Sequence, residues 1–186
     1  MSHHVLAKLP PAELSKLSPS LGEFTEHEQP AVRAAALGGL GLLDHDELAS
    51  YAPCAIAQLT QPNAELRRTA VEVLGRLKPA ALAEHATHLA SRLEDDDDDV
   101  RAAALTTLTR LSKDDLSERA GEKVVSLLEH DSPNVRTTAL RVLIHLPPEA
   151  HAKAMGAIAA RMKDDDPVVR RTALGALCQR DRERES

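Results

Sequence analysis

One pair of residues returns along the chain at nearly constant intervals: a branched apolar residue followed directly by arginine. The five copies are Val32-Arg33, Leu66-Arg67, Val100-Arg101, Val135-Arg136 and Val169-Arg170, spaced by 34, 34, 35 and 34 residues. An alanine and an apolar residue begin three positions after each arginine, and a leucine lies seven positions after it. Steps of three and four keep such side chains on one side of a helix. The pattern therefore predicts five amphipathic helices, one beginning near each pair.

A second apolar stripe precedes each of these helices. Before Arg101, for example, Leu82, Ala86, Leu89 and Leu93 fall on one helical face. Polar turns containing Asp, Asn or Pro separate the two stripes, and these residue types favour the start of a new helix. A single helical hairpin cannot bury its stripe alone, so neighbouring hairpins are expected to stack around a continuous core. The predicted units of this single array are 9–43, 44–77, 78–111, 112–146 and 147–180.

The two ends of the chain depart from this repeat. Residues 5–9 read like residues 73–77, so we expect them to be the last turn of a partial preceding unit, with the chain being a segment of a longer array or an array with a truncated first repeat. Residues 181–186 are polar and are expected to form a solvated tail.

Glycine and the one long interval predict local irregularities. Gly38, Gly39 and Gly41 lie inside a predicted helix, where glycine is unfavourable, so we expect close packing against a neighbour there. The 35-residue interval places one extra residue in the first helix of the fourth unit. A π-bulge, a kink or a late helix start near Gly121 would accommodate it.

The repeat resembles HEAT repeats, in the short form typified by the phycobilisome-lyase-like motif. In that family an Asp in the turn precedes a Val-Arg pair; Asp95 and Asp164 match it, six residues before Arg101 and Arg170. His27, Gln61 and His130 stand at the corresponding positions of the other units, so any aspartate ladder is incomplete. The resemblance covers residues 9–180. It implies an all-α, right-handed α-solenoid (superhelix) of about five HEAT-like helical hairpins.

Composition narrows the function. Aromatic residues make up only 1% of the chain, whereas enzyme pockets usually contain several, so we predict that the chain is not an enzyme and has no cofactor. The net charge of −6 argues against nucleic acid. No apolar run reaches the length of a membrane span. Cys54 and Cys178 lack metal-site spacing and are expected to be unpaired buried thiols, in the cytoplasm or another reducing intracellular compartment.

Two clusters could suggest metal binding, and both have simpler interpretations. The acidic run 95–99 lacks the alternating ligands and the glycine of a calcium loop and is expected to be a solvated helix start. His85 and His88 can share a helix face, but zinc requires further ligands that the nearby sequence does not supply. We therefore predict no metal.

The five repeat arginines could form a track for an anionic ligand or could hold the fold together. Since the same arginine marks HEAT repeats with many different partners, we predict a structural role, in which each pairs with turn carboxylates and helix ends of its own or an adjacent unit. These structural residues are Arg33, Arg67, Arg101, Arg136 and Arg170.

The outward positions of the second helices, which line the concave side in HEAT solenoids, form a modestly basic face. Interfaces favour arginine and aromatic anchors, and this chain can offer only arginine. The predicted partner-binding residues are Arg68, Glu72, Arg76, Arg110, Arg141, His145 and Arg171. We expect this face to bind a protein or peptide that is acidic or extended.

The predicted function is thus a protein-interaction scaffold or adaptor. Two alternatives remain open at this point. The family resemblance implies a chromophore (bilin) lyase-like accessory as one, and the scarcity of aromatic anchors leaves a structural subunit of a large assembly as the other.

Overall fold

The computed structural model describes residues 6–184, with side chains up to Cys178, and every regular element in that range is a helix. The predicted all-α fold is confirmed, and each of the five apolar-Arg pairs lies in the second helix of a hairpin. The chain divides into two compact units, one ending at His88 and the other beginning at Leu89.

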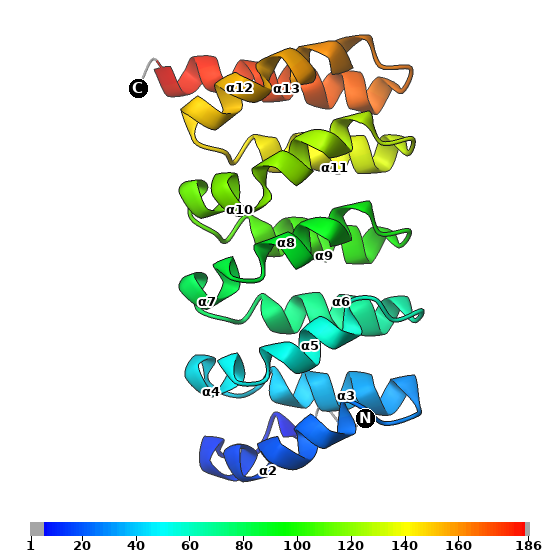
Figure 1. Cartoon of the computed structure of the whole chain (residues 1–186), viewed down its shortest axis with the longest axis vertical. Coiled ribbons are helices and arrows are strands. Elements are labelled where there is room, and N and C mark those ends of the chain that lie inside the picture. The colour runs from blue at the N-terminus through cyan, green and yellow to red at the C-terminus, as the bar shows by residue number, and fades with distance from the viewer. Residues whose placement is uncertain (1–5, 185–186) are drawn as a thin grey trace. The chain divides into compact units, whose positions relative to one another are not determined.

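The N-terminal unit contains the first two hairpins (Figure 1). The first hairpin consists of α2 (Pro11–Phe24) and α3 (Pro30–Leu40), and the second of α4 (His45–Ala49), α5 (Ala52–Gln58) and α6 (Ala64–Leu74). The first helix of the third hairpin begins in this unit as α7 (Pro79–Ala83). Helix α3 packs against both α2 and α6. The second helices α3 and α6 thus form one layer, and α2, α4 and α5 form the other.

Helix starts in this unit follow from local chemistry. Asp44 accepts hydrogen bonds from the backbone N–H groups of Asp46 and Glu47 at 2.9 and 3.0 Å, and Asn63 Oδ1 accepts from Leu66 N–H at 2.9 Å. The first helix of the second hairpin is broken between α4 and α5, next to Pro53, which has no N–H to donate.

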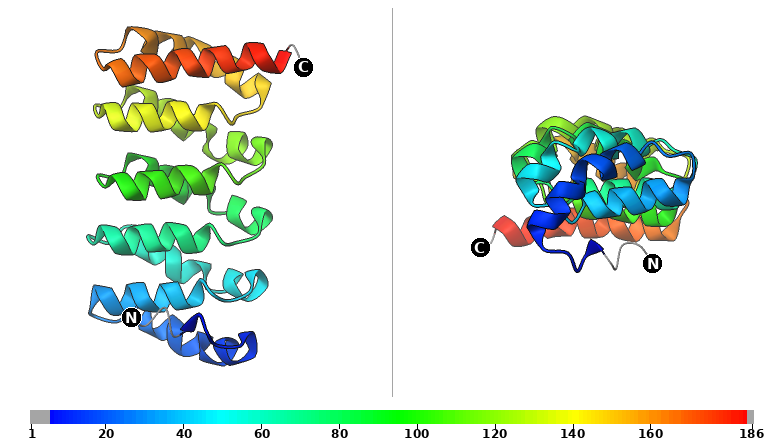
Figure 2. Two further views of the ribbon diagram at one scale, coloured as in Figure 1. Left: turned by 180° about the vertical axis from the view of Figure 1, so that it is seen from behind. Right: turned by 90° about the horizontal axis from the view of Figure 1, so that it is seen from below.

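The C-terminal unit contains the remainder of the third hairpin and the fourth and fifth hairpins (Figure 2). Helix α8 (Ala86–Ala90) spans the boundary and continues as the 3₁₀ turn η1 (Ser91–Glu94) before α9 (Asp98–Leu108). The fourth hairpin contains α10 (Lys113–Ser126), η2 (Leu127–Glu129) and α11 (Pro133–Leu143), and the fifth contains α12 (Pro148–Ala160), η3 (Arg161–Lys163) and α13 (Pro167–Arg184). Helix α11 packs against both α9 and α13, while α10 and α12 lie in the other layer.

The extra residue of the fourth repeat lies in its first helix. The helical stretch 113–129 is one residue longer than the corresponding stretch 148–163. Helix α10 nevertheless runs as an unbroken α-helix past Gly121, so the expected π-bulge is absent there. The extra residue is accommodated because the first helical stretch of the fourth hairpin is one residue longer. It changes the spacing between repeats and not the helical geometry.

The core consists of leucine, valine and alanine. Leu37, Leu40 and Leu74 are almost fully buried in the N-terminal unit, as are Leu128 and Leu140 in the C-terminal unit. Phe24, by contrast, is 51% exposed, so the chain's one phenylalanine lies outside the core.

Glycines permit close approach in the N-terminal unit, as their pattern predicts. A Cβ atom at Gly41 would lie 3.1 Å from Val73 Cγ2 on α6, and one at Gly39 would lie 2.9 Å from Leu6 Cδ1. Gly41 has ordinary right-handed helical backbone angles, so space rather than backbone conformation requires glycine there.

The predictions for the chain ends and the cysteines have mixed outcomes. Of the predicted partial unit 5–9, Val5 lies outside the described residues, and Leu6 packs on α3 near Gly39. Residues 181–184 continue α13, and 185–186 lie outside the described range. Both cysteines are free, but Cys178 is exposed and Cys54 is half-buried, so the expectation of buried thiols is wrong for Cys178. None of the described helices is both long and apolar enough to span a membrane.

Candidate interaction surface of the second helices

The five repeat arginines share one bonding pattern. The Nη1 of four of them donates to two backbone carbonyls of the preceding turn, six and five residues earlier in the chain. The distances are 2.8 and 3.1 Å for Arg33, 3.0 and 3.0 Å for Arg67, 2.8 and 2.8 Å for Arg136, and 2.6 and 2.8 Å for Arg170. Arg101 Nη1 donates to the carbonyl of Asp95, and its guanidinium pairs with Asp98. Each arginine therefore fastens the turn of its own hairpin.

Asp164 joins two successive repeats. Its carboxylate receives two hydrogen bonds from Arg136 of the fourth hairpin, Nε–Oδ2 at 2.9 Å and Nη2–Oδ1 at 2.6 Å. The two side chains are only 3% and 12% exposed. The hydrogen bond from Arg136 lowers the pKa of Asp164, and the same bond raises the pKa of Arg136. The aspartate of the motif thus contacts Arg170 through its backbone carbonyl and the previous repeat's arginine through its carboxylate.

The first repeat lacks this carboxylate. Gln61 stands at the position of the second hairpin that corresponds to Asp164, and Arg33 corresponds to Arg136. The Nε of Arg33 is buried and has no hydrogen-bond acceptor among the described residues. At the junction of the fourth and fifth hairpins the repeat arginine therefore bridges to the next repeat. At the junction of the first and second hairpins the Nε of the corresponding arginine makes no such bond.

The acidic run 95–99 starts a helix. Asp97 caps α9 by accepting hydrogen bonds from Asp99 and Val100 N–H at 3.0 and 3.1 Å, and buried Asp95 lies 3.5 Å from an Arg92 nitrogen. In the part of the chain that the structure describes, no three His, Cys, Asp or Glu side chains gather as metal ligands would.

The two predicted histidine neighbours lie close together in the structure. The ring centroids of His85 and His88 are 6.5 Å apart, and the rings are tilted by 57°. Burial lowers the pKa of His85, which keeps its imidazole neutral over a wider range of pH.

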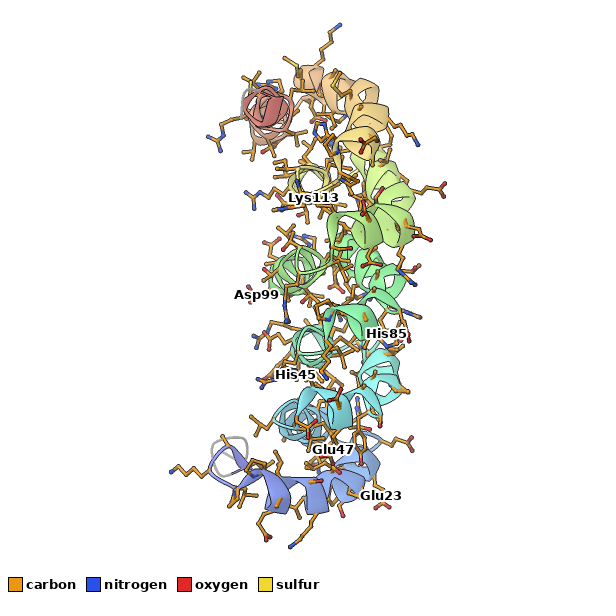
Figure 3. The ribbon with its side chains drawn as sticks, turned by 90° about the vertical axis from the view of Figure 1, so that its left-hand side faces the viewer. Glu23, His45, Glu47, His85, Asp99 and Lys113 are labelled. Carbon is orange, nitrogen blue, oxygen red and sulfur yellow. The ribbon has the colours of Figure 1, made fainter. Side chains whose placement is uncertain are left out.

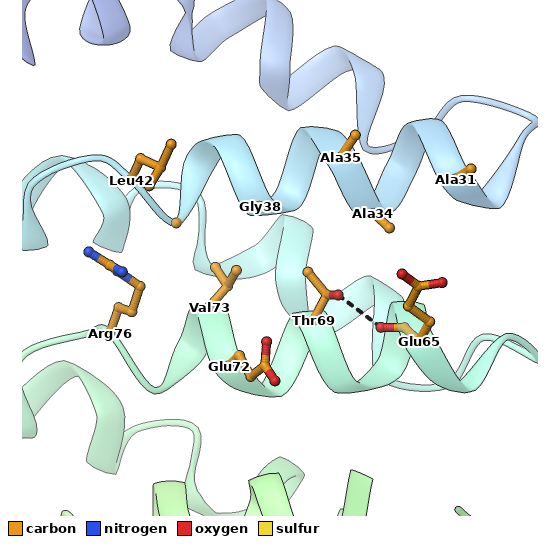
Figure 4. Close-up of a pocket in the computed structure, with 11 residues that line it drawn as sticks. Ala31, Ala34, Ala35, Gly38, Leu42, Glu65, Thr69, Glu72, Val73 and Arg76 are labelled. Carbon is orange, nitrogen blue, oxygen red and sulfur yellow. Dashed lines mark hydrogen bonds between the residues drawn. The ribbon is translucent and has the colours of Figure 1, made fainter. Parts of the chain in front are cut away.

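A groove lies between α3 and α6 of the N-terminal unit (Figure 4). Its volume is about 710 Å³. Small and apolar side chains form most of its lining, with three charged residues among them. The lining residues are Ala31, Ala34, Ala35, Gly38, Gly41, Leu42, Glu65, Thr69, Glu72, Val73 and Arg76.

The structure brings three of the predicted partner-binding residues together at this groove. Glu72 and Arg76 line it, and both are exposed. Arg68 donates to Glu72 Oε1 at 2.8 Å, one helical turn away, so these two charges largely neutralise each other. Arg76 and Glu65 stand near opposite ends of the groove (Figure 4).

The other four predicted residues belong to the C-terminal unit and are exposed: Arg110 after α9, Arg141 and His145 on and after α11, and Arg171 on α13. Their side chains form no ion pair with any described residue. The predicted outward positions of the second helices did not include Ala31, Ala34 and Glu65. These residues lie one position after or two positions before a repeat arginine, Arg33 or Arg67.

A comparison with solved structures finds the same arrangement of hairpins. A designed armadillo repeat protein in complex with the peptide (KR)₄ matches with a TM-score of 0.62 at 17% identity, covering 94% of this chain and 88% of that one. Computationally designed armadillo repeat proteins for modular peptide recognition match with a TM-score of 0.63 at 16% identity, covering 96% and 90%. Such low identity shows the fold alone. The fold defines a helical-repeat protein of the armadillo and HEAT type.

The sequence comparison gives the family. Residues 18–109 match the family model of HEAT repeats, and this part of the chain belongs to the HEAT-repeat family. The match begins within the first helix of the first repeat and extends into the last residues of the third. A comparison with curated proteins gave no match.

Proposed function

We propose that this chain is a non-catalytic scaffold that binds an extended polypeptide segment along its second helices. The groove between α3 and α6 is the observation that carries the proposal. Its floor of alanine and glycine leaves room for a peptide main chain to approach the helices closely. A repeat protein of this fold has no need of an enclosed pocket to bind a partner, because its stacked helices present a long surface.

The charges in the groove favour an acidic group at one end. Glu72 is compensated by Arg68, whereas the Arg76 guanidinium is exposed and makes no ion pair with a described residue. Glu65 stands near the other end (Figure 4). A bound segment would therefore place a carboxylate at Arg76.

The C-terminal unit supports the same preference. Arg110, Arg141 and Arg171 are exposed on or after its second helices, with His145 among them. The designed armadillo protein similar in fold is in complex with a basic peptide. The complex of a protein of this fold with a peptide supports the proposal. The exposed positive side chains of this chain favour an acidic segment as its own partner.

Fluorescence anisotropy with two labelled eight-residue peptides, (Glu-Ala)₄ and (Lys-Ala)₄, tests this preference. We expect the acidic peptide to bind more tightly and the double variant Arg76→Glu/Arg110→Glu to weaken that binding by about tenfold or more. The matched control is Lys153→Glu, which reverses an exposed charge on the first helix α12 and should leave the affinity unchanged. Equal binding of both peptides, or unchanged affinity in the double variant, would overturn the proposal.

A second variant separates the groove from general charge attraction. Gly38→Leu places a bulky side chain in the groove without changing charge, and we expect binding of the acidic peptide to fall by about tenfold. The control is Gly156→Leu on α12, where a Cβ atom meets nothing within 4 Å. If both variants bind equally well, the peptide does not occupy the groove.

A further inference from the structure

The fifth hairpin carries a second surface, unrelated to the groove, that its neighbours lack. Met162 and Leu174 are 42% and 50% exposed. Their counterparts in the fourth hairpin, Leu128 and Leu140, are completely buried, at 0% exposure each. The difference arises because the fifth hairpin covers the fourth through α12 and α13, while none of the described residues covers the fifth.

The junction inside the C-terminal unit shows what such a surface accepts. Arg161 of the fifth hairpin donates to the carbonyl of Leu128 at 3.0 Å, beside the buried leucines. Asp164 places its carboxylate against the Nε and Nη2 of Arg136. A covering hairpin thus supplies an apolar face together with a carboxylate in its turn.

The guanidinium of Arg170 presents the same pair of donors, Nε and Nη2, without the carboxylate that the Arg136 guanidinium binds. Its Nη1 is used by the carbonyls of Asp164 and Asp165, as in the other repeats. Its Nε and Nη2, the atoms corresponding to those that bind Asp164 in Arg136, have no acceptor among the residues that the structure describes. Arg170, Met162 and Leu174 occupy the same repeat positions as Arg136, Leu128 and Leu140. The exposed Arg170 guanidinium therefore has the same placement relative to Met162 and Leu174 as Arg136 has relative to the two buried leucines.

Cys178 completes this surface. It corresponds to Gly41 of the first hairpin, where an added Cβ atom would lie 3.1 Å from Val73 of the next hairpin. The position therefore faces the covering repeat, and Cys178 is exposed where that repeat would lie.

We propose that the surface formed by Met162, Arg170, Leu174 and Cys178 docks a helical hairpin of the same repeat type that carries a carboxylate in its turn. Two matching features select this occupant. The apolar side chains occupy the same repeat positions as those buried at the junction of the fourth and fifth hairpins. The Nε and Nη2 of Arg170 require an acidic group at one defined place. A general apolar contact would satisfy the first feature and not the second.

The test joins residues 1–180 to a second copy of residues 147–186, which keeps the spacing between repeats and supplies a further Asp164. Cys54→Ala and replacement of the added Cys178 by Ser leave one thiol at the surface. We expect its alkylation by iodoacetamide to slow by about tenfold or more relative to the unextended chain with the same Cys54→Ala change, because docking must open before the thiol reacts. A Gly-Ser extension of equal length is the matched control and should leave the thiol reactive.

Two further variants test the chemistry of the contact. Asp164→Ala in the added copy alone should restore part of the reactivity, and Leu174→Glu in the original copy should restore nearly all of it. An extended chain that reacts as fast as the unextended one would overturn the proposal. So would protection that does not change when the added Asp164 is replaced.

Sedimentation of the unextended protein tests whether a second copy of the chain occupies this surface. We expect a monomer, because the first hairpin carries His27 rather than an aspartate at the matching turn position. A concentration-dependent dimer that Leu174→Glu dissociates would assign the surface to a second copy and contradict the occupant proposed here.

Discussion

The first and second hairpins are held together differently from the fourth and fifth. In the N-terminal unit the junction uses largely uncharged donors: Gln58 Nε2 donates to the carbonyl of Thr25 at 3.1 Å, and the Tyr51 hydroxyl donates to Ser18 Oγ at 3.0 Å. Glu47 accepts from the Ser15 and Ser18 hydroxyls across this junction, within the first-helix layer (Figure 3). In the C-terminal unit Arg136 and Asp164 form a nearly buried, two-bond ion pair.

The comparison shows that one repeat geometry can be stabilised in two ways. Glycine at position 41 lets α3 and α6 approach closely, so van der Waals contact contributes at the first junction. At the later junction Ile144 replaces that glycine, and charged hydrogen bonds contribute instead. Hydrogen bonds to charged groups are stronger, but loss of one partner leaves a costly buried charge. The two junctions should therefore respond differently to the same class of substitution.

The largest effect should come from Asp164→Ala. Removing the carboxylate leaves the Arg136 guanidinium in a nearly buried site with only its turn carbonyls as acceptors, so we expect a loss of about 3 kcal/mol in the free energy of unfolding. Urea denaturation followed by circular dichroism measures it. The neighbouring exposed residue gives the control, since Asp165→Ala should change stability by about 0.5 kcal/mol or less. A loss for Asp164→Ala no larger than that of the control would show that the pair contributes little.

Gly41→Val should destabilise the N-terminal junction by about 2 kcal/mol, because the added side chain overlaps Val73 on α6. The same denaturation experiment measures the change. Gly156→Val is the matched control: a Cβ atom there meets nothing within 4 Å, and we expect a change of about 0.5 kcal/mol or less. Equal effects at both glycines would mean that the close approach of α3 and α6 is not needed for stability.

Gln61→Asp should convert the first junction toward the later type. The new carboxylate would offer an acceptor to the buried Nε of Arg33, and we expect a gain of about 1 kcal/mol. A double-mutant cycle with Arg33→Met isolates the interaction, since Gln61→Asp should give no gain once the guanidinium is removed. A gain that persists in the Arg33→Met background would instead reflect a better helix start.

The smallest effect should be a difference in acid sensitivity. The pKa of Asp164 is lowered in the folded protein by the hydrogen bond from Arg136, so the ionised carboxylate stabilises the fold above its ordinary pKa of 3.8. That contribution is lost as the pH falls below 3.8 through the lowered folded-state pKa. Between pH 7 and pH 3 the natural chain should therefore lose more stability than Asp164→Ala, as thermal denaturation at a series of pH values would show. Parallel losses in the two proteins would contradict this assignment.

The repeat itself could be predicted from the sequence. Arg33 and its four counterparts mark the second helices, and the steps of three and four among the leucines identify their buried sides, because helix periodicity and burial are local properties of a repeated sequence. The glycines at 39 and 41 likewise indicated close packing. The partner-binding residues could be predicted only as outward positions, since solvent exposure follows from periodicity but the shape of a groove does not.

The tertiary structure alone decided which groups meet across a junction. In the sequence Asp164 lies six residues before Arg170 of its own hairpin, and its backbone carbonyl accepts a hydrogen bond from that arginine. Its carboxylate instead accepts from Arg136 of the previous hairpin, because α11 packs against α13. Met162 and Leu174 are likewise exposed while Leu128 and Leu140, at the same repeat positions, are buried. The difference lies in whether a further hairpin covers them. A repeated sequence determines each hairpin by local forces, whereas the charge partners and open surfaces depend on which hairpin lies beside it.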